Sequence, residues 1–135
     1  MPFPAVHITV IALAAGTGGL FAQRIRRAAR VMCAAAGAKN AYAEIYLVGD
    51  AMMEKNVLAF PADPRFPRPD IPGKVLGEMY LNPGYIKKHG QNLAHMLSHG
   101  LLHLLGYTHE RARDTMRMER MEKMLCAKVV HIFET

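Results

Sequence analysis

The chain is poor in the features that mark several classes of protein. It has only two cysteines, Cys33 and Cys126, in 135 residues, which is too few for the disulfide framework of a small secreted domain. Both lie in apolar, helix-like surroundings, so we expect buried free thiols. Free thiols make the cytoplasm the default compartment. No internal repeat or low-complexity tract is present.

No apolar run is long enough to span a bilayer, and we expect no membrane partner. The least charged stretch, 8–23, is interrupted by glycines, whereas a spanning helix needs about 20 consecutive apolar residues. It also lacks the basic start of a secretory signal, because no lysine or arginine precedes Arg24. The stretch is better interpreted as a strand, a glycine-rich turn and the start of a helix.

Acidic residues are absent from the first third of the chain. Residues 1–43 contain five lysines and arginines and no acid, while the remainder carries 12 bases and 11 acids. Nearly all of the net charge of +6 therefore lies in this third. A basic face attracts polyanions, above all nucleic acid, although a merely soluble basic surface explains the charge equally well.

The pattern of the sequence predicts one α+β domain over residues 1–135. Apolar residues make up 51% of the chain, which is enough for a core. Runs rich in β-branched residues, or alternating in polarity, predict strands at 5–13, 41–48, 56–60 and 74–81. We expect one mixed sheet of about four strands, packed with helices.

Three helices are expected from apolar spacing. The first, 19–36, has a buried stripe containing Ile25 and Met32, with Arg26, Arg27 and Arg30 on the opposite face. The second, 91–105, is apolar nearly all round, which predicts a central, buried helix. The third is expected to begin near Thr108 as N-cap, with Glu110 in its first turn. Its expected buried stripe consists of Met118, Met121, Leu125 and Val129.

Three histidines on and after the central helix have the spacing of a metal site. His99 and His103 are four residues apart, so both side chains lie on one helix face and their imidazoles can meet one ion. Gly106 can turn the chain back and bring His109 to the same ion. Three nitrogen ligands leave one open position, which is typical of a catalytic zinc site. A single buried histidine is usually a core residue, but burying three without a ligand is costly.

The remaining residues of the motif separate two kinds of hydrolase. The spacing H-x3-H-x2-G-x2-H is also that of metzincin proteases, which need a glutamate directly after the first histidine as general base. Gly100 occupies that position here. The sequence therefore argues against a peptidase of that kind, and no side chain is assigned as base. A water activated by the metal is the expected nucleophile.

The histidine segment resembles the signature H-G-x-L-H-L-x-G-Y-D-H of the YbeY family of bacterial endoribonucleases, which act in ribosomal RNA maturation. Residues 99–109 read H-G-L-L-H-L-L-G-Y-T-H, and His95-Met96 precede them as in many members. Upstream, residues 56–61 resemble the family strand N-V-L-S-F-P, and residues 76–79 resemble its L-G-D-I strand. The chain is thus similar to a short, divergent member.

The resemblance implies a zinc-dependent endoribonuclease that cuts single-stranded RNA, with ribosomal RNA or a ribosomal subunit as partner. It makes His99, His103 and His109 the ligands of one zinc ion. His95, one helical turn earlier, is a candidate to support the ligands or contact the substrate, and a packed core histidine explains it equally well. Glu78, which stands for the family aspartate, is a second candidate to support the ligands.

The chain departs from the family pattern at several positions. The segment L-N-x-x-Y/W-R between the second and third strands is replaced by a short link, 49–55, without an arginine. Ala59 replaces a serine, and Thr108 replaces the aspartate before the last ligand.

Charge on a phosphoryl transition state must still be met by cations. Lys55, Arg65 and Arg68 are the candidates, because they flank the third strand. Arg26, Arg27 and Arg30 are candidates for holding RNA phosphates, which gives affinity without sequence choice. A solvated helix face is the ordinary interpretation of those three arginines.

Two other functions remain open at this point. A metal-dependent peptidase or other hydrolase would keep the same ligands but would need a base from elsewhere. A non-catalytic ribosome-assembly factor would keep the metal for stability, and the missing arginine segment favours it.

Overall fold

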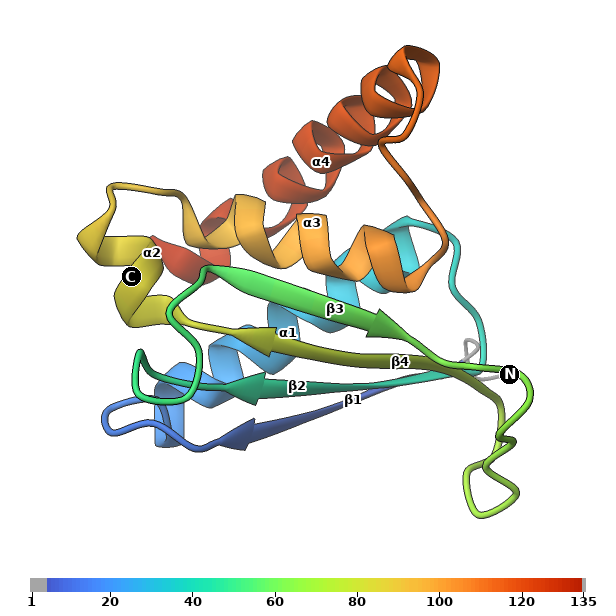
Figure 1. Ribbon diagram of the computed structural model, residues 1–135, viewed down its shortest axis with the longest axis horizontal. Helices are drawn as coiled ribbons and strands as arrows, with labels where there is room; N and C mark the ends of the chain where they lie inside the picture. Colours follow the sequence, from blue (N-terminus) through green and yellow to red (C-terminus); the bar gives the residue numbers. More distant parts are fainter. Residues whose placement is uncertain (1–4, 135) are drawn as a thin grey trace.

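The fold is built on a mixed sheet whose strands lie in the order β1-β2-β4-β3 (Figure 1). A computed structural model describes residues 5–134. Its strands are β1 (Val6–Ala12), β2 (Ala41–Leu47), β3 (Val57–Pro61) and β4 (Lys74–Leu81). β1, β2 and β4 run parallel, and β3 pairs antiparallel with β4. β1 and β3 are therefore the two edges of the sheet.

Four helices accompany the sheet, which confirms the predicted α+β domain. They are α1 (Gly19–Ala35), α2 (Pro83–Lys88), α3 (Leu93–Leu104) and α4 (Ala112–Phe133). α1 packs on β1, and α3 packs on β3 and β4. α4 lies across α1 and α3 as an outer layer, and its first turns project beyond the rest of the fold (Figure 1).

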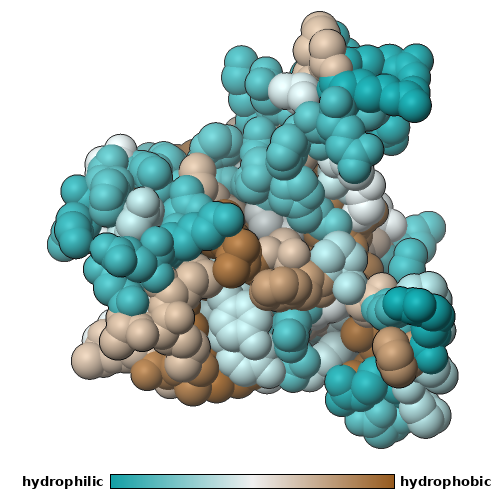
Figure 2. Space-filling view, viewed as in Figure 1, coloured by the Kyte–Doolittle hydropathy of each residue, from teal (hydrophilic) through white to brown (hydrophobic). Residues whose placement is uncertain are grey.

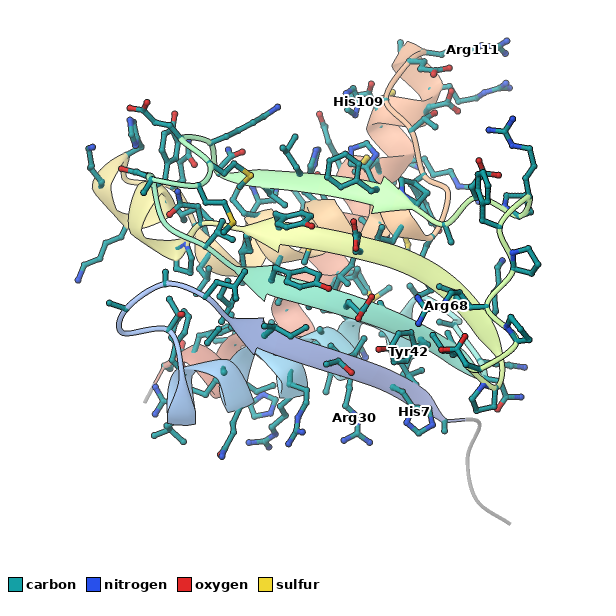
Figure 3. All side chains as sticks on the ribbon, turned by 60° about the horizontal axis from the view of Figure 1, so that its bottom comes forward. His7, Arg30, Tyr42, Arg68, His109 and Arg111 are labelled. Atoms are coloured by element: carbon teal, nitrogen blue, oxygen red, sulfur yellow. The ribbon has the colours of Figure 1, made fainter. Side chains whose placement is uncertain are left out.

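The two faces of the sheet differ in burial. Along β2 the side chains alternate strictly, with Ala41, Ala43, Ile45 and Leu47 buried on the helix side. The intervening residues are half-buried on the other face, which no described helix covers (Figure 3). That uncovered face is called the open face below. A sheet packed on one side accounts for this alternation of apolar and polar residues.

α3 is the central helix, as its apolar composition predicts. Its sides meet β3, β4, α1, α2 and α4, and Leu97, Leu101 and Leu102 are fully buried. Burial of such leucines is worth about 1.5–3 kcal/mol each, so packing rather than helix propensity holds α3 in place. Its histidines therefore stand on a rigid element.

Helix α2 is absent from the sequence prediction, which has no helix between the fourth strand and the central helix. Asn82 is the N-cap of α2, and its side chain accepts a hydrogen bond from the backbone N–H of Tyr85 at 3.0 Å. Pro83 follows at the first helical position, where its missing N–H costs nothing. An asparagine followed by proline was the available signal for a helix start.

The predicted start of the last helix is wrong by about one turn. α4 begins at Ala112 with Arg111 as N-cap, so Thr108 and Glu110 lie in the preceding link. That link holds His109 in place through its backbone. The carbonyl of Tyr107 accepts a hydrogen bond from His103, and the carbonyl of His109 accepts one from Thr115. A helix with Thr108 as its N-cap would have taken His109 into its first turn.

Both cysteines are free, as expected. Cys33 is fully buried in α1, and burial raises the pKa of its thiol to about 12. Cys126 is half-buried on α4, 3.8 Å from the hydroxyl of Ser98. Among residues 5–134, no helix combines the length and apolar character that crossing a bilayer requires.

Candidate metal centre

Two elements place the three histidines of the motif around one point. His99 and His103 lie one turn apart on α3, and His109 arrives from the link before α4. Gly106, in a left-handed conformation with φ of 97°, reverses the chain between them. Ligand nitrogens of all three lie within 4.8 Å of one another, so the group could hold a metal ion.

The two helical imidazoles point the same nitrogen at the centre. Nε2 of His103 lies 3.1 Å from Nε2 of His99. Two nitrogens that are each about 2.0–2.1 Å from a tetrahedral ion stand on the order of 3.3 Å apart. The pair is therefore close to ligand separation.

The hydrogen bonds on the far side of each ring show what these two nitrogens offer. Nδ1 of His99 faces the Glu122 carboxylate at 2.7 Å, and Nδ1 of His103 faces the Tyr107 carbonyl at 3.0 Å. A carboxylate and a carbonyl accept hydrogen bonds, so Nδ1 of each ring points outward to its partner and Nε2 of each ring points to the centre. A metal ion at the centre would take a lone pair from each Nε2, and three nitrogen donors suit zinc.

The environment of His103 favours the form that binds metal. Burial lowers the pKa of His103, and the neighbouring His99 lowers it further, while the hydrogen bond to Tyr107 acts in the opposite direction. A lowered pKa keeps the imidazole neutral at pH 7, and only a neutral imidazole can donate its lone pair to an ion.

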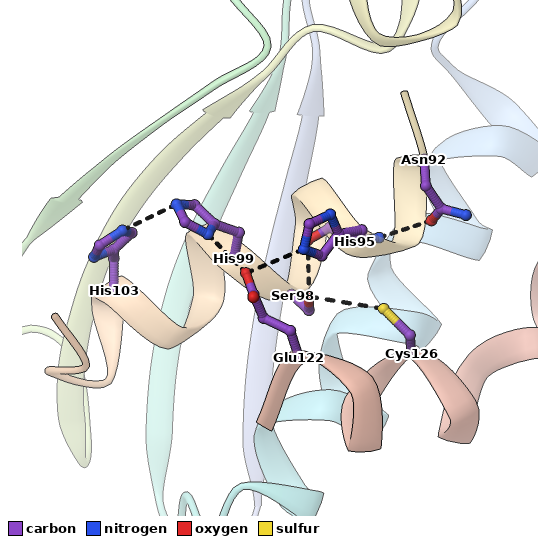
Figure 4. Close-up of polar contacts among 7 residues, drawn as sticks. All are labelled: Asn92, His95, Ser98, His99, His103, Glu122 and Cys126. Atoms are coloured by element: carbon purple, nitrogen blue, oxygen red, sulfur yellow. Dashed lines mark hydrogen bonds and ion pairs between the residues drawn. The ribbon is translucent and has the colours of Figure 1, made fainter. Parts of the chain in front are cut away.

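Glu122 is the important site residue that the sequence reasoning missed. It lies on α4 and is only 6% exposed. Its Oε2 accepts the hydrogen bond from His99 and lies 3.3 Å from Nε2 of His95 (Figure 4). A signal was present, since Glu122 continues the buried stripe of Met118 and Leu125 at helical spacing. A carboxylate in such a stripe needs a partner inside the fold.

Gly100, where a metzincin has its glutamate, is buried against the sheet. A Cβ at this position would lie 2.1 Å from Sδ of Met79 and 3.0 Å from Cγ2 of Val57. Met79 is fully buried, and Val57 is nearly so. There is consequently no room here for a longer side chain unless both neighbours move, which agrees with the sequence argument against a metzincin.

Two hollows meet at the histidines. The strand hollow, of about 480 Å³, lies between α3 and β3, and the helix hollow, of about 850 Å³, lies between α3 and α4. Both are lined by His95, His99 and His109. Figure 2 shows hydrophilic residues over the outer part of α4 and the loop 62–73, with hydrophobic residues between them. The histidine cluster is thus reached from two sides.

Of the three cations expected beside the metal, the structure brings one to the site. Lys55 lines the strand hollow. Arg65 and Arg68 lie in the loop 62–73, where each pairs with an aspartate two residues away: Arg65 with Asp63 at 2.8 Å and Arg68 with Asp70 at 3.1 Å. These two arginines do not line the hollows beside the histidines.

Of the two supporting residues expected, His95 adjoins the cluster and Glu78 does not. His95 is 46% exposed at its side chain and lines both hollows. Glu78 lies on β4 next to the buried Met79, so it faces the open side of the sheet. It lines a separate hollow there with Phe60 and Tyr80.

The three arginines of α1 are exposed but do not share one setting. Arg26 and Arg30 line a third hollow, beside the β1 edge of the sheet, whereas Arg27 lines none of the hollows described. β1 is the edge opposite to β3, so this hollow lies away from the histidines.

Comparison with known proteins identifies the family. The family model described as Endoribonuclease YbeY matches residues 50–130, which include all three histidines and Glu122. A protein named Endoribonuclease YbeY from Bartonella quintana is 39% identical over 82 residues, covering 55% of this chain and 51% of the relative. One of the same name from an Anaeromyxobacter species is 34% identical over 124 residues, covering 77% of this chain and 62% of the relative.

The match is confined to part of each relative. A Pseudomonas putida protein of the same name is 37% identical over 84 residues, or 52% of its length. The chain thus spans about half the length of most of these relatives. The matched part carries the histidine cluster and the elements that hold it, and the match covers more than half of this chain. The chain belongs to the endoribonuclease YbeY family.

Proposed function

We propose that this protein is a zinc-dependent endoribonuclease that cuts single-stranded RNA during ribosomal RNA maturation in the cytoplasm. The observation that carries the proposal is the convergence of His99, His103 and His109 in a chain of this family. His99, His103 and His109 would hold one zinc ion through nitrogen. When bound, zinc polarises a phosphoryl oxygen and lowers the pKa of water to about 7.

The chain's own residues have distinct tasks in this proposal. Glu122 and the Tyr107 carbonyl hold the protons at Nδ1 of His99 and His103, so that Nε2 of each stays free for the ion. His95, on the wall shared by the two hollows, contacts substrate beside the ligands. Lys55 supplies positive charge to the phosphate in the strand hollow.

Cleavage assays with a matched control test this proposal. Zinc-loaded protein is incubated with ribosomal RNA, with an unstructured RNA and with a perfect duplex, beside His103→Ala and His131→Ala. His131 is an exposed histidine near the end of α4, outside the cluster. We expect the wild type and His131→Ala to cut unpaired RNA, and His103→Ala not to cut. Cutting that survives in His103→Ala contradicts the proposal.

A second function is favoured by the charges around the site. Among the described residues, Lys55 is the one lysine or arginine that lines the strand hollow, and Arg65 and Arg68 lie in the loop 62–73, paired with aspartates. Few cations suit a non-catalytic assembly factor that keeps zinc for stability. That function predicts salt-sensitive RNA binding without cutting. Release of peptides from casein in the same assay would instead indicate a peptidase.

A further inference from the structure

The third hollow, lined by Arg26 and Arg30, has the composition of a ligand site. It has a volume of about 480 Å³ and lies at the β1 edge of the sheet. Polar side chains from three elements and the loop 62–73 line it. We call it the basic hollow, and its main lining residues are His7, Thr9, Arg26, Arg30, Tyr42 and Pro72.

The basic hollow carries positive charge that neighbouring carboxylates do not neutralise. Arg26 and Arg30 stand one turn apart on α1, and neither has a carboxylate within 4.0 Å among residues 5–134. Asp70 also lines the hollow, but its carboxylate is bonded by both Nε and Nη2 of Arg68 at 3.1 Å. Two guanidinium groups thus remain for an anionic ligand, and their planar forks fit phosphate oxygens.

Two rings stand beside these guanidinium groups. His7 on β1 and Tyr42 on β2 are register partners on the open face of the sheet. Figure 3 shows them with Arg30 at the same end of the sheet. Combining cations for the backbone with rings for unpaired bases is how proteins hold single-stranded nucleic acid. β1 pairs with no described strand except β2, so its outer backbone groups also face this edge.

The histidine cluster has few lysines or arginines around it, so the positive charge needed to bind RNA has to come from elsewhere, and the basic hollow offers it. One lysine lines the strand hollow, and the helix hollow combines Lys123 with Glu119 and Glu122. Most affinity for RNA comes from cations on phosphates, so the cluster alone is a weak RNA site. Three strand spacings, about 15 Å, separate the two edges of the sheet.

A continuous segment joins the basic hollow to the cluster. Pro61, at the end of β3, lines the strand hollow, and Ile71 and Pro72 line the basic hollow. The loop 62–73 connects them and carries Phe66, which is 73% exposed. An extended single strand of RNA that follows this loop would run from one hollow to the other.

We infer that the basic hollow binds the phosphate backbone of single-stranded RNA through Arg26 and Arg30, and so anchors a strand whose continuation reaches the histidine cluster. This inference rests on the proposed function. It assigns RNA binding to two of the three exposed arginines of α1 and not to Arg27, because Arg27 lies outside the hollow. The RNA-binding role of the basic hollow is called the anchor below.

Salt-dependent binding of a labelled oligouridylate tests the inference. Zinc-loaded wild type is compared with the double variant Arg26→Ala/Arg30→Ala by fluorescence anisotropy, and the RNA is checked on a gel after each titration. The control is Arg27→Ala/Lys128→Ala, which removes the same charge from exposed helical positions outside the hollows.

The expected result is a change of slope. Each lost phosphate contact lowers the slope of log affinity against log salt by about 0.7 for a single strand. The Arg26/Arg30 variant should therefore show a slope shallower by about 1.4, so that its affinity falls about sevenfold less than that of the wild type between about 50 and 200 mM salt. The control pair should keep a slope close to that of the wild type.

Three results would overturn the anchor: equal slopes in the wild type and the Arg26/Arg30 variant, an equal loss in the control pair, or competition by polyglutamate as strong as competition by RNA. A duplex RNA that binds as tightly as the oligouridylate would remove the preference for single strands. Failure of the proposed function is separate. Wild type that binds with the expected pattern but does not cut contradicts the catalytic proposal and leaves the anchor standing.

Discussion

At the scale of single residues, Glu122 joins two elements, because its carboxylate is on α4 and its hydrogen-bond partner, His99, is on α3. Glu122→Gln keeps the size of the side chain but removes the charge. We expect zinc affinity to fall about 10–100-fold, the usual cost of losing a partner behind a histidine ligand. Competition with a chromophoric chelator measures this affinity.

Glu119→Gln is the matched control, one turn earlier on the same helix. Glu119 is exposed and lines the helix hollow but makes no ion pair with a described residue. It should keep wild-type zinc affinity. If Glu122→Gln binds zinc as tightly as Glu119→Gln does, the carboxylate does not support the ligand.

Gly100 provides a second prediction at this scale. In Gly100→Ala, the new methyl group overlaps Met79 and Val57 in the core. Overpacking costs about 1–3 kcal/mol, and the better helix propensity of alanine returns up to about 1 kcal/mol. We expect a net loss of about 1 kcal/mol in the free energy of unfolding, measured by urea denaturation.

Gly84→Ala serves for comparison, because its Cβ would meet only the Asn82 side chain at 3.7 Å. It should leave stability unchanged or slightly raised. Equal stability of the two variants would mean that Met79 and Val57 move aside for the new methyl group at little cost in free energy.

At the scale of elements, α4 begins without a side-chain cap. Arg111 occupies the N-cap with extended φ and ψ of −117° and 155° and makes no capping hydrogen bond. Arg111→Asp supplies an acceptor for the free N–H groups and a negative charge at the positive end of the helix dipole. We expect a gain of about 1 kcal/mol in the free energy of unfolding.

Arg120→Asp makes the same change of charge in the middle of α4, where no cap can form. It should be neutral or destabilising, since aspartate is a poorer helix former than arginine. Thermal unfolding of both variants checks the prediction, and a gain in both would point to charge rather than capping.

The helices and strands also show how much of the fold the sequence predicts. Strict alternation in β2 and the apolar surface of α3 are strong periodic signals, and the strands and α3 were predicted within about two residues. The start of α4 was not, because local capping preference at Thr108 yields to the link that brings His109 to the cluster. Tertiary demands override local propensity at such places.

The candidate site likewise has one part that the sequence predicts and another that depends on how the helices and loops pack. The spacing of three histidines close together in sequence predicts that they form one cluster, and their nitrogens converge. Glu122, 23 residues from His99, depends on how α4 packs against α3. Arg65 and Arg68 each pair with an aspartate two residues away in the loop 62–73. No periodic signal reports either kind of contact.

At the scale of the whole molecule, the proposed zinc site predicts that zinc adds to stability, because a ligand that binds the folded protein more tightly than the unfolded chain favours folding. At a free concentration 1,000 times its dissociation constant, a ligand adds about 4 kcal/mol. We expect zinc-loaded protein to need more urea to unfold than protein treated with EDTA. In His109→Ala this difference should shrink while the fold persists, because His109 is exposed.

His131→Ala, outside the cluster, should show the full effect of zinc. Identical unfolding curves for zinc-loaded and EDTA-treated wild type would argue against a metal ion at the three histidines.

The strand hollow and the helix hollow lie on either flank of α3 and share His95, His99 and His109. A blind pocket admits a polymer only by its end, whereas a trough that continues past the reactive point admits it by its middle. Under the proposed function, an RNA laid across the two hollows has no terminus to thread, and its two fragments depart on separate sides. The proposal therefore predicts that a closed circle of RNA is cut as readily as a linear one.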